Sequence, residues 1–353
     1  MKKNKRPTAR LTTAIADLFP GYFALVMATG IVSIAAKLLG IDSAAWALLA
    51  VNVLSYLVLS VFLIIRSIRF TDRLKTDLTD HVRGPGFFTV PAGTCVLGSQ
   101  LIIVTESFDI AAALWFVSIV LWLLIMYGFF AAVTTREQKP PLEKGLSGSW
   151  LIAAVATQSI SVLGTLLAGY FTRYRVELLF FTLCMFFVGC MLYLLLITLI
   201  FYRFTFLDLT SERLTPPYWI NMGAVAITTL AGARLMLAAP EFRLIGEILP
   251  FLKGFTLFFW SAGSWWIPLL FVLGIWRHIY MRYPLQYDPQ YWGLVFPLGM
   301  YTVCTIQLAH ALNFESLLLI PKLFVYLAFA AWLTAFCAMI YSLFPNRRAV
   351  VNG

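Results

Sequence analysis

The sequence predicts an all-α integral membrane protein that crosses the bilayer about ten times. Apolar residues make up 61% of the 353 residues, charged residues make up 12%, and the mean hydropathy is +0.86. A globular domain is about 45–50% apolar and about 25% charged, so a soluble chain could not hide this much apolar surface. One transmembrane helix needs roughly 20 residues, which leaves no room for a soluble domain of ordinary size.

Ten apolar runs are separated by breaks that contain turn-forming residues, as at Pro85 and Pro216. The predicted spans are residues 19–40, 44–65, 87–105, 110–133, 149–171, 176–202, 218–238, 252–275, 291–312 and 323–344. We therefore expect an N-terminal tail over 1–18, a ten-helix transmembrane domain over 19–344 and a C-terminal tail over 345–353.

Positively charged residues are distributed unevenly between the two sides of the predicted domain. If both termini are cytoplasmic, 19 of the 26 Lys and Arg residues fall in the tails and the cytoplasmic loops. Lys and Arg are enriched in the cytoplasmic loops of membrane proteins, whereas acidic residues contribute little to orientation. The distribution predicts a multi-pass protein of a bacterial-type cytoplasmic (inner) membrane with both termini in the cytoplasm.

A short motif recurs in the predicted odd-numbered helices. The first helix opens with Pro20-Gly-Tyr-Phe and reaches Thr29, and the third opens with Pro85-Gly-Phe-Phe and reaches Thr94 at the same spacing. Aromatic residues recur where the seventh helix begins, at Tyr218. An aromatic belt at the membrane interface would explain the rings, but not the matched Pro-Gly and Thr positions. A period of two helices predicts five hairpins in one orientation, and such repeats commonly surround a transport path.

The odd-numbered helices also carry more small polar residues than the even-numbered ones. In equal windows the odd set has 17 Ser, Thr, Asn or Gln and 8 Gly, and the even set has 8 and 4. We therefore predict that the odd helices form an inner ring around a polar path and the even helices an outer ring facing lipid. The alternative is that these residues only allow close helix packing. The residues predicted to line the path are Thr29, Ser33, Thr94, Gly98, Thr157, Ser161, Thr228 and Thr302.

Charged residues are almost absent from these windows. Only Lys37 and Arg234 occur, both near the predicted outer ends of odd helices, and there is no acidic residue. This argues against a carboxylate proton relay and against a cation pore with an acidic ring, and predicts two basic groups at the outer mouth of an anion path. The alternative is that both side chains reach the interface without contacting a path. Pro91 and Pro297 are predicted to kink helices of the inner ring.

Signatures of enzymes and cofactor sites are missing from the sequence. The three histidines lack metal-ligand spacing, and there is no phosphate-binding glycine loop or nucleophile elbow. All five cysteines fall inside apolar runs and are predicted to be small buried side chains. The net charge of +10 belongs to the loops, so we predict no nucleic-acid partner, no metal, no cofactor and no enzymatic activity.

Two segments carry a resemblance to a known family. The run Phe19-Pro-Gly-Tyr-Phe-Ala-Leu-Val-Met-Ala-Thr-Gly-Ile-Val-Ser33 and the run Phe296-Pro-Leu-Gly-Met-Tyr301 resemble the tellurite-resistance/dicarboxylate transporter family. That family includes the slow-type anion channels of plant guard cells and fungal malate and sulfite permeases. The resemblance covers the chain from the first helix through the tenth. It implies five hairpins around a pseudo-five-fold axis, odd helices that line a central pore, a homotrimer with one pore per subunit, and a pore gate at Phe296.

Together these observations predict the passage of small inorganic or organic anions across the lipid bilayer through a largely uncharged pore, as a channel or uniporter. One alternative is a coupled carrier or exporter of C4-dicarboxylate, sulfite or tellurite. A further alternative is a membrane sensor or scaffold that transports nothing, in which the odd helices are merely packed together.

Overall fold

The computed structural model describes residues 7–343, and within them ten helices are long and apolar enough to cross a membrane. The predicted all-helical fold with ten spans is therefore confirmed. The long helices are α2 (Ala24–Leu38), α3 (Asp42–Arg69), α5 (Thr89–Thr105), α6 (Phe108–Thr135), α8 (Ile152–Leu167), α9 (Arg175–Phe206), α10 (Ile220–Leu237), α12 (Leu249–Ile275), α13 (Trp292–Leu312) and α14 (Leu319–Leu343).

Shorter helices begin many of these spans or connect them. The short α-helices are α1 (Pro7–Ala16), α4 (Thr71–Leu78), α7 (Leu142–Gly145) and α11 (Arg243–Glu247). The 3₁₀ helices are η1 (Pro20–Phe23), η2 (Gly84–Phe88), η3 (Gly148–Leu151), η4 (Thr172–Tyr174), η5 (Pro216–Trp219), η6 (Ala239–Glu241), η8 (Pro289–Tyr291) and η9 (Glu315–Leu318). One π-helical turn, η7 (Trp276–Tyr280), continues from the end of α12.

The five odd-numbered spans form a closed inner ring. Helices α2, α5, α8, α10 and α13 each contact the next, and α13 contacts α2. Within an apolar window of 18 residues in each of these spans, 83–94% of the residues are buried, against 17–44% in the corresponding windows of the spans that contain α3, α6, α9, α12 and α14. The small residues of the odd helices permit this close approach, because lipid supplies no hydrophobic force that would press helices together.

The outer helices cover the seams of the inner ring. Each packs against the inner helix of its own hairpin and also against the inner helix of the next hairpin, so that α6 contacts both α5 and α8. Helix α14 closes the circle by contacting α13 and α2. The outer surfaces of these helices expose large apolar side chains such as Leu124, Leu195 and Phe258, as a lipid-facing surface requires.

A second ring lies at the N-terminal ends of the inner helices. The short helices η1, η2, η3, η5 and η8 each contact their neighbours in a closed circle. A Cβ on Gly86 would lie 2.8 Å from the backbone nitrogen of Gly21, and a Cβ on Gly148 would lie 2.3 Å from the carbonyl oxygen of Pro217. Only glycine tolerates such close backbone approach, which explains the Pro-Gly pairs that recur in the sequence.

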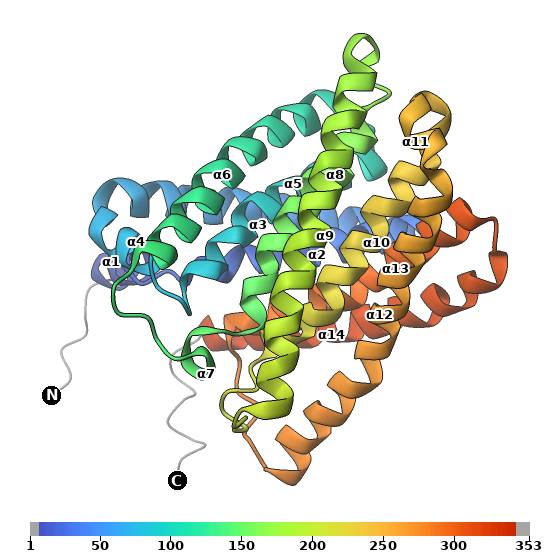
Figure 1. Cartoon of the computed structure of the whole chain (residues 1–353). Coiled ribbons are helices and arrows are strands. Elements are labelled where there is room, and N and C mark those ends of the chain that lie inside the picture. The colour runs from blue at the N-terminus through green and yellow to red at the C-terminus, as the bar shows by residue number, and fades with distance from the viewer. Residues whose placement is uncertain (1–6, 344–353) are drawn as a thin grey trace, which may run out of the picture.

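The beginning and the end of the described chain lie on the same side of the helical bundle, as an even number of spans requires (Figure 1). The predicted N-terminal tail, residues 1–18, contains helix α1, and Asp17 directly after it forms an ion pair with Arg73. The predicted C-terminal tail, residues 345–353, lies outside the described residues, and α14 ends at Leu343.

Candidate functional site

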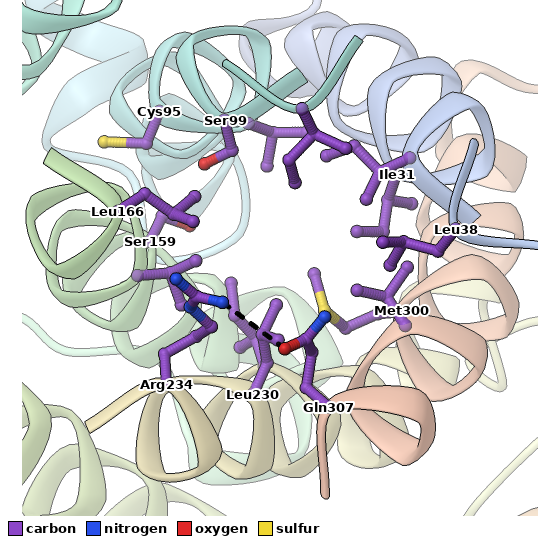
Figure 2. A pocket seen from close by; sticks show the side chains of 16 residues that line it. Ile31, Leu38, Cys95, Ser99, Ser159, Leu166, Leu230, Arg234, Met300 and Gln307 are labelled. Atoms are coloured by element: carbon purple, nitrogen blue, oxygen red, sulfur yellow. Dashed lines mark hydrogen bonds between the residues drawn. The ribbon is translucent and has the colours of Figure 1, made fainter. Parts of the chain in front are cut away.

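A cavity of about 120 Å³ lies inside the inner ring, and side chains from all five inner helices line it (Figure 2). The lining residues are Ile31, Ile34, Leu38, Cys95, Val96, Ser99, Ile103, Ser159, Val162, Leu166, Ile227, Leu230, Arg234, Met300, Val303 and Gln307. On each helix they run toward its C-terminal end. The cavity therefore occupies the half of the ring that the charge distribution predicts to face outward.

Most of the cavity wall is aliphatic, and its polar groups are few. The hydroxyl of Ser159 donates to the carbonyl of Val155 at 2.8 Å, one turn earlier in the same helix. Ser99 also lines the wall, and the thiol of Cys95 donates outward to Ser118 of α6 at 3.0 Å. Such a wall offers weak dipoles and apolar contact but no fixed negative charge.

Arg234 is the charged residue among those that line the cavity. Its Nη1 donates to Oε1 of Gln307 on the adjacent inner helix α13 at 3.4 Å (Figure 2). Its Nε is buried without a hydrogen-bond partner, and no Asp or Glu between residues 7 and 343 forms an ion pair with it. A partly buried guanidinium without an ion-pair partner attracts an anion into the space beside it, since the nearest acidic charge that acts on it, Glu241, is already paired with Arg175.

Lys37 does not share this position. Its ammonium group forms an ion pair with Asp42 at 2.8 Å, where α2 connects to α3, and it does not line the cavity. Of the two basic groups predicted at the outer mouth, the structure places only Arg234 at the cavity. The reason is local, because Asp42 begins α3 within reach of the end of α2 and neutralises the lysine.

The eight residues predicted to line the path are all buried, but none of them lines the cavity. Ser33 donates to the carbonyl of Ala45 in α3 at 2.7 Å, and Ser161 donates to the carbonyl of Thr182 in α9 at 2.8 Å. A Cβ on Gly98 would meet Leu163 of α8 at 2.6 Å. The other members of the set are Thr29, Thr94, Thr157, Thr228 and Thr302. None of the eight is among the residues that line this cavity, and their place along the transport path remains a prediction.

Three of these threonines make an equivalent contact with the outer ring. The indole N–H of an outer-helix tryptophan donates to Thr157 of α8 and to Thr29 of α2, each at 2.9 Å, and the hydroxyl of Tyr56 lies 3.2 Å from that of Thr94. In each case the aromatic side chain comes from the outer helix of the preceding hairpin in the ring. The same contact joins Trp260 of α12 to Thr305 of α13 at 3.0 Å. The repeated threonines therefore stabilise the seams between the two rings.

Ser99, Ser159 and Gln307 line the cavity but are not among the residues predicted from the sequence. Hydroxyl content alone does not distinguish the two faces of an inner helix, because both faces are buried. The spacing on α10 could have indicated which face meets the cavity. Arg234 shares a face of this helix with Ile227 and Leu230, at intervals of three and four residues, and all three line the cavity.

Phe296 lies on the cavity face of α13, one turn below the cavity. Met300, Val303 and Gln307 line the cavity at intervals of three and four residues, and Phe296 precedes Met300 by four. Residues at that spacing share one face of a helix. The side chain is 1% exposed. This position is compatible with a plug between the cavity and the ring of short helices.

The two prolines predicted to kink the inner ring have different positions. Pro297 lies inside α13, and its ring packs against α10, where a Cβ on Gly223 would lie 2.7 Å from its Cγ. Pro91 lies in the first turn of α5, directly after η2, so a kink at Pro91 would fall where the two helices join and remains a prediction. A proline in the first turn removes an N–H that has no partner inside the helix.

Comparison with known proteins gives both partial and nearly full-length relatives. An uncharacterized membrane protein of Mycobacterium tuberculosis is 38% identical over 154 residues, which cover 43% of this chain and 77% of that protein. An uncharacterized transporter of Methanocaldococcus jannaschii is 25% identical over 81% of this chain and 82% of its own. A sulfite efflux pump of Arthroderma otae is 24% identical over 93% of this chain and 91% of its own.

Residues 17–340 match a single protein family, described as voltage-dependent anion channel. The match extends from the segment before η1 into α14 and so includes both rings. It agrees with the resemblance seen in the first and ninth helices. This chain is a multi-pass membrane protein and belongs to the SLAC1 family of voltage-dependent anion channels.

Proposed function

We propose that this protein moves small anions across the membrane along the axis of its inner ring. The observation that carries the proposal is the cavity that all five inner helices enclose, with the guanidinium of Arg234 at its wall, whose Nε has no hydrogen-bond partner. The route would run from this cavity past Phe296 and through the ring of short helices to the other side. Family membership supports an anion as the transported species.

The composition of the cavity suits transient binding of a small anion. Arg234 supplies one positive charge, while Ser99 and Ser159 supply weak dipoles on a wall that is otherwise aliphatic. Conduction requires binding that is strong enough for entry and weak enough for release. One guanidinium partly engaged by Gln307 meets both conditions, and a volume of about 120 Å³ suits a small ion with little of its hydration water.

Phe296 is the proposed gate. An apolar ring on the axis leaves an anion with neither water nor dipoles, and such desolvation costs several kcal/mol even for a neutral polar group. Rotation of the ring away from the axis would open the route without any change in the backbone of the five inner helices. A channel or uniporter with this gate is the mechanism we favour over a coupled carrier.

The orientation and assembly of the protein are part of the same proposal. Both termini would be cytoplasmic in a bacterial-type inner membrane, which places the cavity toward the outside and the ring of short helices toward the cytoplasm. Family resemblance supports a homotrimer with a separate route in each subunit.

Anion flux into proteoliposomes tests the proposal directly. We expect chloride and nitrate to pass faster than malate, because one guanidinium can pair with a single negative charge. The Arg234→Gln variant should retain its folded yield and lose flux, and Lys37→Gln should lose much less. Absence of flux for all anions from correctly folded protein would favour the sensor or scaffold alternative.

A second candidate function is sulfite efflux, which the name of the relative from Arthroderma otae suggests. Coupling to a proton gradient would separate an exporter from a channel. Sulfite movement that follows an imposed pH gradient, against its own concentration gradient, would support the coupled carrier. Movement that only dissipates the sulfite gradient would support the channel.

A further inference from the structure

A second buried arginine without a counter-ion lies far from the ring cavity, at the end of α12. Arg277 is 7% exposed and belongs to the π-helical turn η7. Its guanidinium carbon lies 4.3 Å from the centre of the ring of Tyr283, which stacks on it. Its Nε is buried without a partner, and its side chain forms no hydrogen bond or ion pair with any residue between 7 and 343.

The guanidinium faces a cavity of about 110 Å³. Helix α12, the short helix η5 and the start of α13 enclose this cavity, which is lined by Leu214, Thr215, Pro216, Tyr218, Trp219, Leu270, Leu273, Gly274, Arg277, His278, Tyr291 and Leu294. No carboxylate occurs among these residues. The volume is several times the roughly 30 Å³ that one water molecule occupies in the liquid, so an oxyanion fits.

The backbone around Arg277 is shaped to hold this position. The π-helical turn replaces the regular end of α12, and Arg282 has a positive φ of 51°. The carbonyl of Arg277 accepts a hydrogen bond from the backbone N–H of Tyr283 at 3.0 Å, and Nδ1 of His278 lies 3.0 Å from the carbonyl of Tyr283. Single π-helical turns are frequent at functional sites, and here the turn directs a cation inward without supplying an acceptor.

A larger apolar cavity of about 460 Å³ adjoins the first. It shares Tyr291 and Leu294 with the Arg277 cavity and continues along α14 past Ala331, Ala335 and Ala338. The smaller cavity thus contains the positive charge of Arg277, and the larger cavity beside it has a long apolar surface along α14. A lipid with an anionic headgroup and an acyl chain complements both cavities. A free inorganic anion complements only the cavity that contains the positive charge.

We propose that Arg277 binds the phosphate group of an anionic phospholipid, whose acyl chain follows the adjoining apolar cavity along α14. The guanidinium can donate two parallel N–H hydrogen bonds to two oxygens of one phosphate group, which is the geometry that arginine commonly adopts with phosphates. Because the headgroup would contact η5 and the start of α13, bound lipid would hold α12 against the ring of short helices.

Native mass spectrometry of the full-length protein in detergent tests this assignment. Wild type is titrated with phosphatidylglycerol or with phosphatidylcholine, and the number of retained lipids is counted. We expect Arg277→Gln to weaken phosphatidylglycerol binding by at least about tenfold, since a charge-assisted hydrogen bond is lost. The matched control Arg282→Gln, in the exposed loop that follows, should bind as wild type does.

A second variant guards against misfolding of Arg277→Gln. Gly274 lines the cavity and a Cβ there meets no atom within 4 Å, so Gly274→Leu fills the site while leaving Arg277 intact. Loss of tight phosphatidylglycerol binding in this variant supports the site. Wild-type affinity in both Arg277→Gln and Gly274→Leu overturns it.

Excess inorganic phosphate distinguishes the two possible sources of the oxyanion. We expect phosphate alone to leave the bound phosphatidylglycerol in place, because the acyl chain adds apolar contact. Full displacement by phosphate, or equal retention of phosphatidylcholine and phosphatidylglycerol, would overturn the assignment to an anionic lipid.

Discussion

The two halves of the inner ring are built from the same five helices but hold different contents. The half where these helices end contains the cavity with Arg234, whereas the half where they begin contains the buried Phe296 and the ring of short helices. Glycines at Gly21, Gly86 and Gly148 bring backbones together at the closed end. The comparison shows that the same five helices surround a cavity where they end and bring backbones into close contact where they begin.

The helix dipoles differ between the halves as well. Five helix C-termini converge around the cavity, and each carries partial negative charge that would repel an anion. Arg234, in the last turn of α10, offsets this charge. At the other end the five N-termini carry partial positive charge, so no additional buried cation is needed on the axis.

Removing the block in the closed half should produce the largest effect. Truncation by Phe296→Ala is expected to raise anion flux by at least about tenfold, since lowering the barrier by about 1.4 kcal/mol changes a rate tenfold. Flux into proteoliposomes and folded yield are measured together, with Phe259→Ala in α12 as a buried control. Truncating a core phenylalanine costs about 3–5 kcal/mol of stability, so unchanged flux with poor yield would make Phe296 a packing residue.

Cysteine labelling compares the cavity face with the seam face of one helix. Ser159 lines the cavity, whereas Ser161 donates to the carbonyl of Thr182 in the outer ring. After removal of the native cysteines, Ser159→Cys should react with a water-soluble thiol reagent much faster than Ser161→Cys. Equal rates at the two positions would show that the cavity does not admit water and reagent.

Removing the charge of Arg234 tests the half of the ring that contains the cavity. The attraction between unit charges 4 Å apart is about 1 kcal/mol in bulk water and larger for a partly buried charge, so Arg234→Gln should lower flux by at least about fivefold at low salt. The loss should shrink as salt rises, because the Debye length falls to about 8 Å at physiological ionic strength. Lys37→Gln serves as the control, since Asp42 already neutralises Lys37. A loss that does not depend on salt would indicate a folding defect.

The smallest effect concerns His81, near the closed end. Burial, and then the positive charge of Arg136, lower the pKa of this imidazole, whose Nδ1 has no hydrogen-bond partner. His81 therefore binds a proton more readily in the unfolded chain than in the folded protein. The free energy of unfolding should fall as the pH drops below the ordinary histidine pKa of about 6.5. Thermal unfolding at several pH values measures this loss, which His81→Gln should reduce. An identical pH dependence in the variant would assign the loss to other groups.

The number of spans and the division into two rings could be predicted because they depend on composition. Long apolar runs suit only lipid, and the surplus of small polar residues in odd helices is a property of whole segments. The role of individual hydroxyls could not be predicted in the same way. A hydroxyl in a transmembrane helix can bond its own backbone, a neighbouring helix or an ion, and each bond is worth only about 0.6 kcal/mol.

By itself the sequence determined that the chain spans the membrane ten times, that its odd and even helices differ, and that few charges occupy the membrane. The tertiary structure decided which face of each inner helix meets the cavity. Thr29, Thr94 and Thr157 accept or share hydrogen bonds with aromatic side chains of preceding hairpins, so they face the seams. Such partners lie far away in the chain, up to 303 residues between Thr29 and Trp332. Only packing brings them together, because a buried polar group faces whichever neighbour satisfies it.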